Sequence, residues 1–458
     1  MQRVFIAGGG ISGLSTAYYL AKRGIASTLV EKQDRLGGVI QTETLDGCVV
    51  ESGPDSFISI KPWALELIHE LGLSGEVIGS NDHLRVTYLL RHGRLAPLPD
   101  GLMLMVPTKL WPMITTRLLG WPSKIRMGWE MLRRPPRTPQ ADRSVADFIR
   151  DHYGQEAVDY LAEPLLAGVY GGDPEALSVT SVLPRFVELE ARYGSLSRGV
   201  LSEMRRAHGA TGKATLFRTL KRGLGSLVET AAAAAGPAMA RVRGAVEAIE
   251  RAGSGYRVRV NGEWMEAGHV VLAVPAYQAA EILEGLDAEL ARELAAIPYS
   301  SSTTVSLGYR REEFPHPLNG FGFLVPKRER GRMMACTWVG TKFSHRVPDH
   351  YVLLRCFLGG EASVQDSDQV IVEAVRQELG GIMGVRAQPS FVRIARWPRS
   401  MAQYVVGHQR RLERIEQRLA RLPGLHLAGN GYHGIGVPDC IRMGRDAAAR
   451  IAAATGSV

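Results

Sequence analysis

The chain opens with Arg3-Val-Phe-Ile-Ala7, followed by Gly8-Gly-Gly-Ile-Ser-Gly13, a helical apolar pattern, and Ser27-Thr-Leu-Val-Glu31. This order predicts a buried strand, a Gly-x-Gly-x-x-Gly turn that opens a helix, and a second strand that ends in an acid. Together these parts form the dinucleotide-binding fingerprint in its required structural context. We therefore predict an α/β fold of the Rossmann type.

The residues of the turn have separate tasks in such a fold. Gly8 allows the tight turn, Gly10 lets the backbone approach a pyrophosphate at the helix N-terminus, and Gly13 lets the helix pack close to the strand. Glu31, 18 residues after Gly13, is placed to accept hydrogen bonds from a ribose diol. Its carboxylate also disfavours the 2′-phosphate of NADP. The same cofactor contact is assigned to Gly9, Ile11 and Ser12.

The residues after Glu31 favour FAD over NAD. They read Lys32-Gln-Asp-Arg35-Leu-Gly37-Gly38, and two adjacent glycines let a loop press against the flavin side of the same pyrophosphate. Lys32 belongs to this loop, and Arg35 offers a counter-charge. Farther along, Gly53-Pro54-Asp55-Ser56 is a turn with a fixed backbone, of the kind that passes beneath an isoalloxazine ring.

Composition restricts the class of protein. With 458 residues, 45% of them hydrophobic and 22% charged, the chain should fold as two or three globular domains. Its N-terminus enters a strand without a cleavable signal, and its apolar runs are too short to cross a bilayer. The four cysteines have no paired or metal-type spacing, so we expect buried free thiols in a reducing cytoplasm.

The net charge of +9 is concentrated in one window. Residues 85–143 hold 11 Lys or Arg and three acids, together with the apolar stretches 101–107 and 110–121. A basic and apolar stretch suits an anionic apolar ligand or peripheral contact with an anionic membrane. Nucleic acid is disfavoured because no binding motif accompanies the charge. The alternatives are a solvated face beside a core helix, or a contact between two copies in a homodimer.

Periodicity divides the chain into alternating segments. Residues 1–83, 211–297 and 401–458 are predicted to form a discontinuous FAD-binding domain of the Rossmann type. An inserted mixed α+β substrate domain should occupy 298–400, and a largely helical subdomain 84–210. Within these, we expect a helix over 215–234, a turn over 163–173 directly after a helix, and a last helix over 440–453. The N-terminal amides of that last helix can stabilise negative charge on a reduced flavin.

Specific segments then resemble one family over nearly the whole chain. They include Glu51-Ser-Gly-Pro-Asp-Ser-Phe57, Glu163-Pro-Leu-Leu-Ala-Gly-Val-Tyr170, Gly320-Phe-Gly-Phe-Leu-Val-Pro326 and Gly436-Val-Pro-Asp-Cys-Ile441. In this order and spacing they are similar to the bacterial oxygen-dependent coproporphyrinogen III oxidase and protoporphyrinogen oxidase group, within the amine-oxidase superfamily. The resemblance implies oxidation of a porphyrinogen by FAD and dioxygen, with hydrogen peroxide as the second product.

The resemblance also implies site residues. FAD would contact Val246, Trp397, Val437, Pro438 and Asp439 in addition to the loops above, with Val246 near the adenine. Gly168, Leu324 and Phe357 would clamp the pyrrole rings. Thr87 stands where several protoporphyrinogen oxidases carry an arginine that meets a propionate. Arg85, expected on the same strand face, and Lys61 are the candidate replacements.

The absence of that arginine favours coproporphyrinogen III over protoporphyrinogen IX as the substrate. The pyrrole nitrogen itself assists removal of a hydride from the bridge carbon, so no catalytic base, nucleophile or metal is expected in the protein. The sequence shows no triad, metal or paired-carboxylate motif, and His345, His408 and His433 are interpreted as structural. The competing hypotheses are another oxidase of the superfamily, acting on amines or alkenes, and a non-catalytic flavin-binding protein.

Overall fold

The computed structural model describes residues 3–103, 105–136, 138, 141–207 and 215–456. They form two compact units. The first unit comprises Met1–Ser80, Thr215–Tyr299 and Arg410–Val458, and the second comprises Asn81–Ala214 and Ser300–Gln409. Each unit is therefore assembled from segments that are far apart in the sequence.

The first unit is built on a parallel five-stranded sheet in the order β12–β2–β1–β16–β22. All four residues of β1 are buried, as expected for a strand covered on both faces, and this explains the uninterrupted apolar run at the start of the chain. The strands are β1 (Val4–Ala7), β2 (Ser27–Glu31), β12 (Met239–Arg243), β16 (His269–Leu272) and β22 (Leu425–Leu427).

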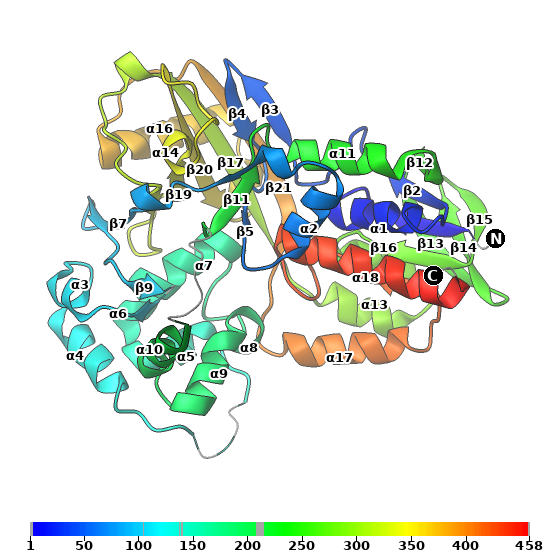
Figure 1. Cartoon of the computed structure of the whole chain (residues 1–458), viewed down its shortest axis with the longest axis horizontal. Helices are drawn as coiled ribbons and strands as arrows, with labels where there is room; N and C mark the ends of the chain where they lie inside the picture. Colours follow the sequence, from blue (N-terminus) through cyan, green and yellow to red (C-terminus); the bar gives the residue numbers. More distant parts are fainter. Residues whose placement is uncertain (1–2, 104, 137, 139–140, 208–214, 457–458) are drawn as a thin grey trace. The chain divides into compact units, whose positions relative to one another are not determined.

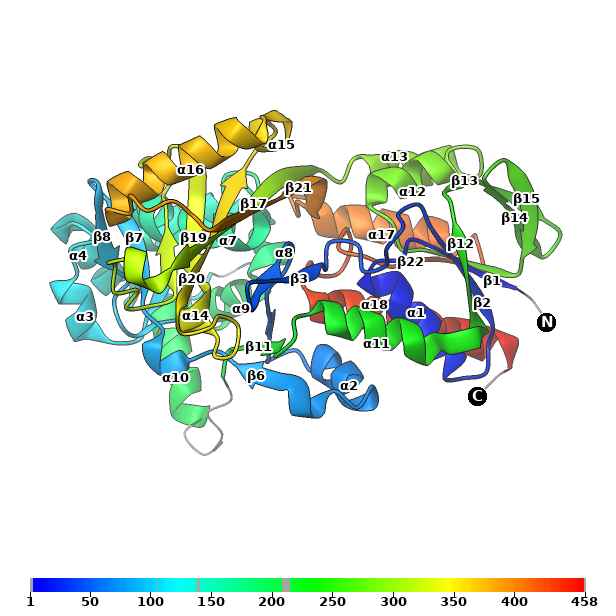
Figure 2. The ribbon, with the colours of Figure 1, turned by 90° about the horizontal axis from the view of Figure 1, so that it is seen from above.

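Helices cover this sheet. Figure 1 shows α1 and α18 side by side, and Figure 2 shows α1, α11 and α18 gathered on one side of the sheet. The last helix begins at Val437, three residues earlier than predicted, because Pro438 is well tolerated in a first helical turn. The helices are α1 (Ile11–Ala21), α2 (Trp63–Glu70), α11 (Gly225–Ala235), α12 (Ala276–Leu283), α13 (Ala288–Ala295), α17 (His408–Leu419) and α18 (Val437–Thr455).

Smaller sheets complete the first unit. The predicted helix over 215–234 is wrong in its first half, because Phe217–Leu220 forms β11 between β5 and β6, and α11 starts only at Gly225. Pairing of this segment with β5 and β6, which lie far earlier in the sequence, outweighs its local helical pattern. The other strands are β3 (Thr42–Leu45), β4 (Cys48–Glu51), β5 (Phe57–Ile58), β6 (Val77–Gly79), β13 (Val246–Ala252), β14 (Gly255–Val260) and β15 (Glu263–Ala267).

The second unit contains a seven-stranded sheet in the order β21–β17–β20–β19–β18–β7–β8. Residues 87–97, which the sequence assigned to the helical subdomain, supply two of its strands, and β7 pairs parallel to β18. One face of the sheet packs on α16 (Asp368–Met383) through Ile371, Val375 and Leu379. The strands are β7 (Thr87–Arg91), β8 (Arg94–Pro97), β17 (Tyr299–Arg310), β18 (Gly322–Leu324), β19 (Met333–Trp338), β20 (Tyr351–Gly359) and β21 (Phe391–Ala402).

The rest of the second unit is mostly helical. The turn expected over 163–173 is wrong in its first part: Glu163–Tyr170 is helix α7, and the turn starts at Gly171, whose φ of 56° closes the helix. Two helices are short: α14 (Val339–Lys342) directly follows β19, and α15 (Ala362–Gln365) follows β20. The other helices are α3 (Leu110–Thr115), α4 (Trp121–Glu130), α5 (Val145–Tyr153), α6 (Gln155–Ala157), α8 (Val179–Val182), α9 (Pro184–Tyr193) and α10 (Leu196–Ala207), with a π-helical turn over Val158–Ala162 and short strands β9 (Leu102–Met103) and β10 (Val106–Pro107).

A buried polar network holds four of these helices together. His152 on α5 lies 2.9 Å from Glu130 of α4 through Nδ1 and 3.1 Å from Glu190 of α9 through Nε2. Glu130 also accepts hydrogen bonds from the Ser195 hydroxyl and the Leu196 N–H at the start of α10. Burial alone would raise the pKa of Glu130, but these hydrogen bonds outweigh it and leave that pKa below its usual range.

The His426–His269 stack predicts acid-sensitive stability in the first unit. The two rings lie 5.9 Å apart, and burial together with His269 and Arg450 lowers the pKa of His426 from 6.5 to about 4. Between these values the unfolded chain binds a proton that the folded chain does not, so stability falls as pH drops below 6.5. The wild-type free energy of unfolding should fall between about pH 7.5 and about pH 5. In His426→Phe we expect this fall to be smaller by about 2 kcal/mol.

Urea unfolding of the two proteins at both pH values measures this difference. The control is His69→Phe, since His69 lies exposed on α2. Equal pH dependence in wild type and His426→Phe would show that His426 does not cause the acid sensitivity.

Candidate functional site

The glycine-rich turn has the geometry that a bound pyrophosphate requires. Gly8 has a φ of 100°, and a Cβ on Gly13 would lie 1.9 Å from the Gly8 carbonyl oxygen, so both positions require glycine. A Cβ on Gly10, in contrast, would meet no atom within 4 Å. The chain therefore leaves open space at the N-terminus of α1, where Ile11, Ser12 and Gly13 present N–H groups without intrahelical acceptors.

Glu31 is held at the end of β2 beside this turn. Its Oε2 accepts the Gly9 N–H at 2.7 Å, and its Oε1 accepts the Gln33 N–H at 2.8 Å. The Gly244 N–H donates to the Glu31 carbonyl at 3.0 Å, which brings the start of β13 and the buried Val246 to the same strand end. The remaining lone pairs of the oriented carboxylate can accept a ribose diol, and this contact stays a prediction.

The double-glycine loop packs directly on the turn. The Gly37 N–H donates to the Gly9 carbonyl at 2.8 Å, and a Cβ on Gly38 would lie 3.2 Å from the Gly10 Cα. A Cβ on Gly53 would lie 1.7 Å from the Val39 carbonyl, so the Gly53–Ser56 loop, with Pro54 and Asp55, packs against the same segment. The structure thus gathers three loops that the sequence had singled out separately.

The two charged residues of the double-glycine loop differ in their surroundings. The Arg35 guanidinium reaches the Leu36 and Ile40 carbonyls, and burial lowers its pKa. This places a desolvated cation beside the turn, where it can serve as a counter-charge. Lys32 is exposed.

The N-terminus of α18 reaches the same region. A Cβ on Gly444 would lie 2.4 Å from the Ser12 carbonyl, and the Cys440 thiol hydrogen-bonds Ser12 while burial raises its pKa to about 12. Val437, Pro438 and Asp439 are buried at this helix start. Lys61, a candidate for a propionate, is instead bound to Asp439, with Nζ 2.6 Å and 2.8 Å from the two carboxylate oxygens. Lys61 therefore anchors the loop before α2 to α18.

The candidate substrate residues of the second unit share one face of its sheet. Leu324 lies opposite Ala335, which lies opposite Phe357, and directly opposed side chains project to the same face. Thr87 lies on this face too, because Leu89, two residues later, is opposite Leu324. A Cβ on Gly168 of α7 would lie 3.5 Å from Leu324 Cδ2. The face therefore brings Thr87, Leu324 and Phe357 together, with α7 against it.

Arg85 is not placed as predicted. It follows the single 3₁₀ turn Asp82–Leu84 and precedes β7, so it lies outside the strand and does not share a strand face with Thr87. Sequence analysis missed Arg355, which is buried and lies 4.7 Å over the Phe357 ring. Its position two residues before Phe357 in a strand is the signal that would have placed it on the same face.

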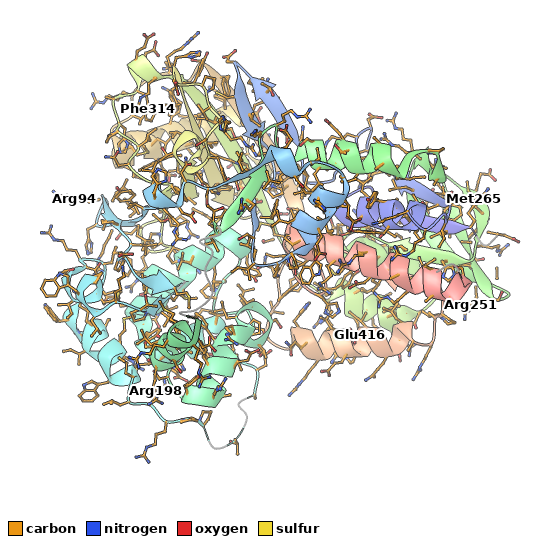
Figure 3. The ribbon with its side chains drawn as sticks, in the orientation of Figure 1. Arg94, Arg198, Arg251, Met265, Phe314 and Glu416 are labelled. Carbon is orange, nitrogen blue, oxygen red and sulfur yellow. The ribbon has the colours of Figure 1, made fainter. Side chains whose placement is uncertain are left out.

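The remaining candidates fall elsewhere. Trp397 lies on β21 of the second unit, and its flavin contact stays a prediction. His408 stacks on Tyr404 at 4.1 Å, and the His433 ring lies 3.2 Å from Glu416, which Figure 3 labels on α17. His345 is exposed with a φ of 67°.

Comparison with known proteins agrees with this geometry. Residues 11–452 match the family of flavin containing amine oxidoreductases. The chain is 33% identical to a coproporphyrinogen III oxidase of Bacillus subtilis over 97% of each protein, and 28% identical to a chloroplastic protoporphyrinogen oxidase of Oryza sativa subsp. japonica over 97% of this chain and 87% of that one. A crystal structure of a protein from Exiguobacterium sp. 255-15 matches with a TM-score of 0.87 and 31% identity over 98% of each chain.

FAD fits the loops of the first unit. The open space at Gly10, the helix N-terminus beside it and the oriented Glu31 carboxylate match the pyrophosphate and ribose of the cofactor. The cofactor is therefore FAD, and we propose that the Gly8–Gly13 turn, Glu31 and the Gly37–Gly38 loop hold it.

Two alanine substitutions in the turn should have different effects. Gly10→Ala meets no atom of the protein, so we expect a folded chain that has lost most of its FAD, because the Cβ occupies the space of the pyrophosphate. Gly13→Ala collides with the Gly8 carbonyl, so we expect the fold itself to be destabilised. Flavin absorbance per protein and the melting temperature of the apoprotein separate these outcomes.

Gly75→Ala is the control, since its Cβ would also meet nothing within 4 Å and it lies in the same unit, outside the turn. Full FAD content in Gly10→Ala would contradict the assignment of the turn to the pyrophosphate.

Proposed function

Because the chain belongs to the family of flavin containing amine oxidoreductases, we propose that it is an FAD-dependent coproporphyrinogen III oxidase. The reaction is the six-electron oxidation of coproporphyrinogen III to coproporphyrin III, with dioxygen as the acceptor and hydrogen peroxide as the second product. The observation that carries the proposal is the sheet face on which Thr87, Leu324 and Phe357 lie together, with Gly168 of α7 against it. The resemblance to a coproporphyrinogen III oxidase over 97% of both chains supports it.

The sheet face suits a substrate that is apolar at its centre and anionic at its edges. Leu324 and Phe357 are half-buried and offer flat apolar contacts for pyrrole rings. Gly168 is exposed on α7, and the absence of a side chain leaves room for a planar ring beside Leu324. These residues bind, orient and shield the substrate, while the ring nitrogen of the porphyrinogen provides the electronic push.

FAD, held by the loops of the first unit, would supply the acceptor for the hydride and the redox chemistry that passes electrons to dioxygen. The first unit contributes the electrostatics around it. The N-terminus of α18 carries a partial positive charge that favours electron density nearby, and the Lys61–Asp439 ion pair holds that helix start in place.

Thr87 bears on the choice between the two porphyrinogens. It is a neutral residue on the substrate face, at a position where several protoporphyrinogen oxidases carry an arginine, and Arg85 lies outside the strand. The relatives described above include proteins named for each substrate, and the coproporphyrinogen III oxidase has the higher identity. Protoporphyrinogen IX is the alternative substrate.

The first experiment compares both porphyrinogens. Purified FAD-loaded protein should produce fluorescent porphyrin in air faster from coproporphyrinogen III than from protoporphyrinogen IX, and each should exceed its enzyme-free control. Without oxygen, coproporphyrinogen III should bleach the flavin absorbance, which separates an oxidase from a non-catalytic flavin protein. A preference for protoporphyrinogen IX would reverse the substrate assignment. No acceleration with either substrate would refute porphyrinogen oxidation.

We also propose that α3 and α4 contact an anionic membrane surface from the cytoplasmic side. Trp121, Ile125 and Trp129 follow one face of α4, Leu132 lies in the turn after it, and each is at least 55% exposed. Trp111 on α3 is 73% exposed. Basic side chains border them, including Arg117, Lys124 and Arg126. Among the described residues, no helix has the length and apolar character to cross a bilayer.

Exposed tryptophans next to basic residues suit the interface of an anionic bilayer. We expect the wild-type protein to sediment with phosphatidylglycerol vesicles at low ionic strength and to lose this binding in high salt. The Trp121→Ser/Trp129→Ser variant should lose most vesicle binding while its melting temperature stays unchanged. Trp264→Ser, an exposed tryptophan on β15, is the control. A wild-type protein that stays in the supernatant, or that forms a dimer lost in the double variant, would contradict the membrane proposal.

A further inference from the structure

The second unit contains a cavity of about 530 Å³, a size typical of small-molecule sites. Its walls come from α7 and the turn after it, the loop between β18 and β19, the ends of β19 and β20, and helix α15. All of these elements belong to one compact unit.

Glycines keep this cavity open. Five of the lining residues are glycines, so backbone forms much of the wall. A Cβ on Gly359 would lie 2.5 Å from the Met334 sulfur, and a Cβ on Gly172 would lie 2.0 Å from Gln403 Oε1. A side chain at either position would force the Met334 or Gln403 side chain to move, so glycine preserves the observed packing around the cavity.

The cavity adjoins the substrate face. Ala167, which lines it, directly precedes Gly168 on α7. Gly359 lies two residues beyond Phe357 in β20 and therefore on the same face, about 7 Å farther along the strand. A ring packed on Phe357 would thus extend one of its edges toward the cavity.

Three cations line the cavity, and their ion pairs differ in burial. Arg330 is bound to Glu163 at 2.6 Å, and both side chains are less than 20% exposed. Lys327 lies 3.0 Å from Asp173, with 68% of the lysine side chain exposed. Arg332 pairs with Asp366 and is 43% exposed. The buried pair fixes the loop on α7, whereas the exposed pairs contribute little stability and can exchange partners.

We propose that this cavity is a carboxylate subsite for the macrocycle, in which Lys327 and Arg332 bind propionate groups of the porphyrinogen or of its porphyrin product. The apolar part of the wall on this side of the sheet, Ala167 and Met334, takes the adjoining ring edge. The cations stand at the rim, where a propionate replaces Asp173 or Asp366 as the partner. This inference rests on the proposed function and assigns residues for the substrate charges that Thr87 and Lys61 do not meet.

Porphyrin binding tests the subsite without requiring turnover. The FAD-loaded protein is titrated with coproporphyrin III and binding is followed by porphyrin fluorescence. Lys327→Gln and Arg332→Gln should each raise the Kd about fivefold, as expected for a partly exposed charged hydrogen bond. Asp173→Asn keeps the side-chain oxygen that accepts the Glu175 N–H but removes the competing charge, so it should lower the Kd about threefold.

Arg328→Gln is the matched control. Arg328 neighbours Lys327, is similarly exposed at 67%, and pairs with Asp159, yet it does not line the cavity. It should bind coproporphyrin III like wild type, and all four variants should retain the wild-type melting temperature. A gain of affinity in Asp173→Asn is a result that a merely structural role would not produce.

The outcomes separate the subsite from the enzyme assignment. If wild type binds coproporphyrin III and oxidises coproporphyrinogen III, but Lys327→Gln and Arg332→Gln bind within twofold of Arg328→Gln, the subsite is wrong and the proposed function stands. If wild type neither oxidises the porphyrinogen nor binds the porphyrin, the proposed function fails and the subsite fails with it.

Discussion

The first unit depends on a close backbone approach that only glycine permits. At Gly13 a single added carbon would lie 1.9 Å from the Gly8 carbonyl, and at Gly8 it would lie 2.6 Å from the Ala273 carbonyl. Because glycine allows these close contacts, only the three residues Gly8–Gly10 separate β1 from α1, and the N-terminal amides of α1 lie beside the open space at Gly10. A similar close contact occurs at Gly444, where α18 packs on the backbone of α1. The glycines of this region therefore serve both the close packing of the backbone and the space for the cofactor.

Features with short-range causes could be predicted from the sequence. The turn, the acid at the end of β2 and the double-glycine loop lie within residues 8–38, and their roles follow from glycine conformation and helix electrostatics. The helix over Val145–Tyr153 was also predictable, because an apolar period of 3.6 and a serine cap lie in one segment and Gly154 closes it at a φ of 89°. In such places local preference and tertiary packing agree.

Features with long-range causes could not be predicted. The local sequence pattern around Phe217–Leu220 favoured a helix. The segment is a strand because it pairs with β5 on one side and β6 on the other, both more than 130 residues earlier. The parallel pairing of β7 with β18 likewise joins residues 87 and 322, and it alone puts Thr87 on the face with Leu324. The Lys61–Asp439 ion pair spans 378 residues. The sequence singled out residues such as Thr87 and Lys61 as candidates. Only the three-dimensional structure shows which residues they contact.

The ion pairs of residues 327–332 show how a loop whose cations are already paired can still recognise an anionic ligand. A carboxylate ligand must either find an unpaired cation or replace a protein carboxylate. Breaking a buried pair such as Arg330–Glu163 leaves a desolvated charge and costs about 3–5 kcal/mol. An exposed pair such as Lys327–Asp173 is worth about 0–1 kcal/mol, and its released carboxylate is immediately rehydrated. A ligand carboxylate can therefore replace the protein carboxylate of an exposed pair at the rim, but not that of the buried pair. A loop that carries one buried pair and three exposed ones, as residues 327–332 do, can stay fixed while its outer cations change partners.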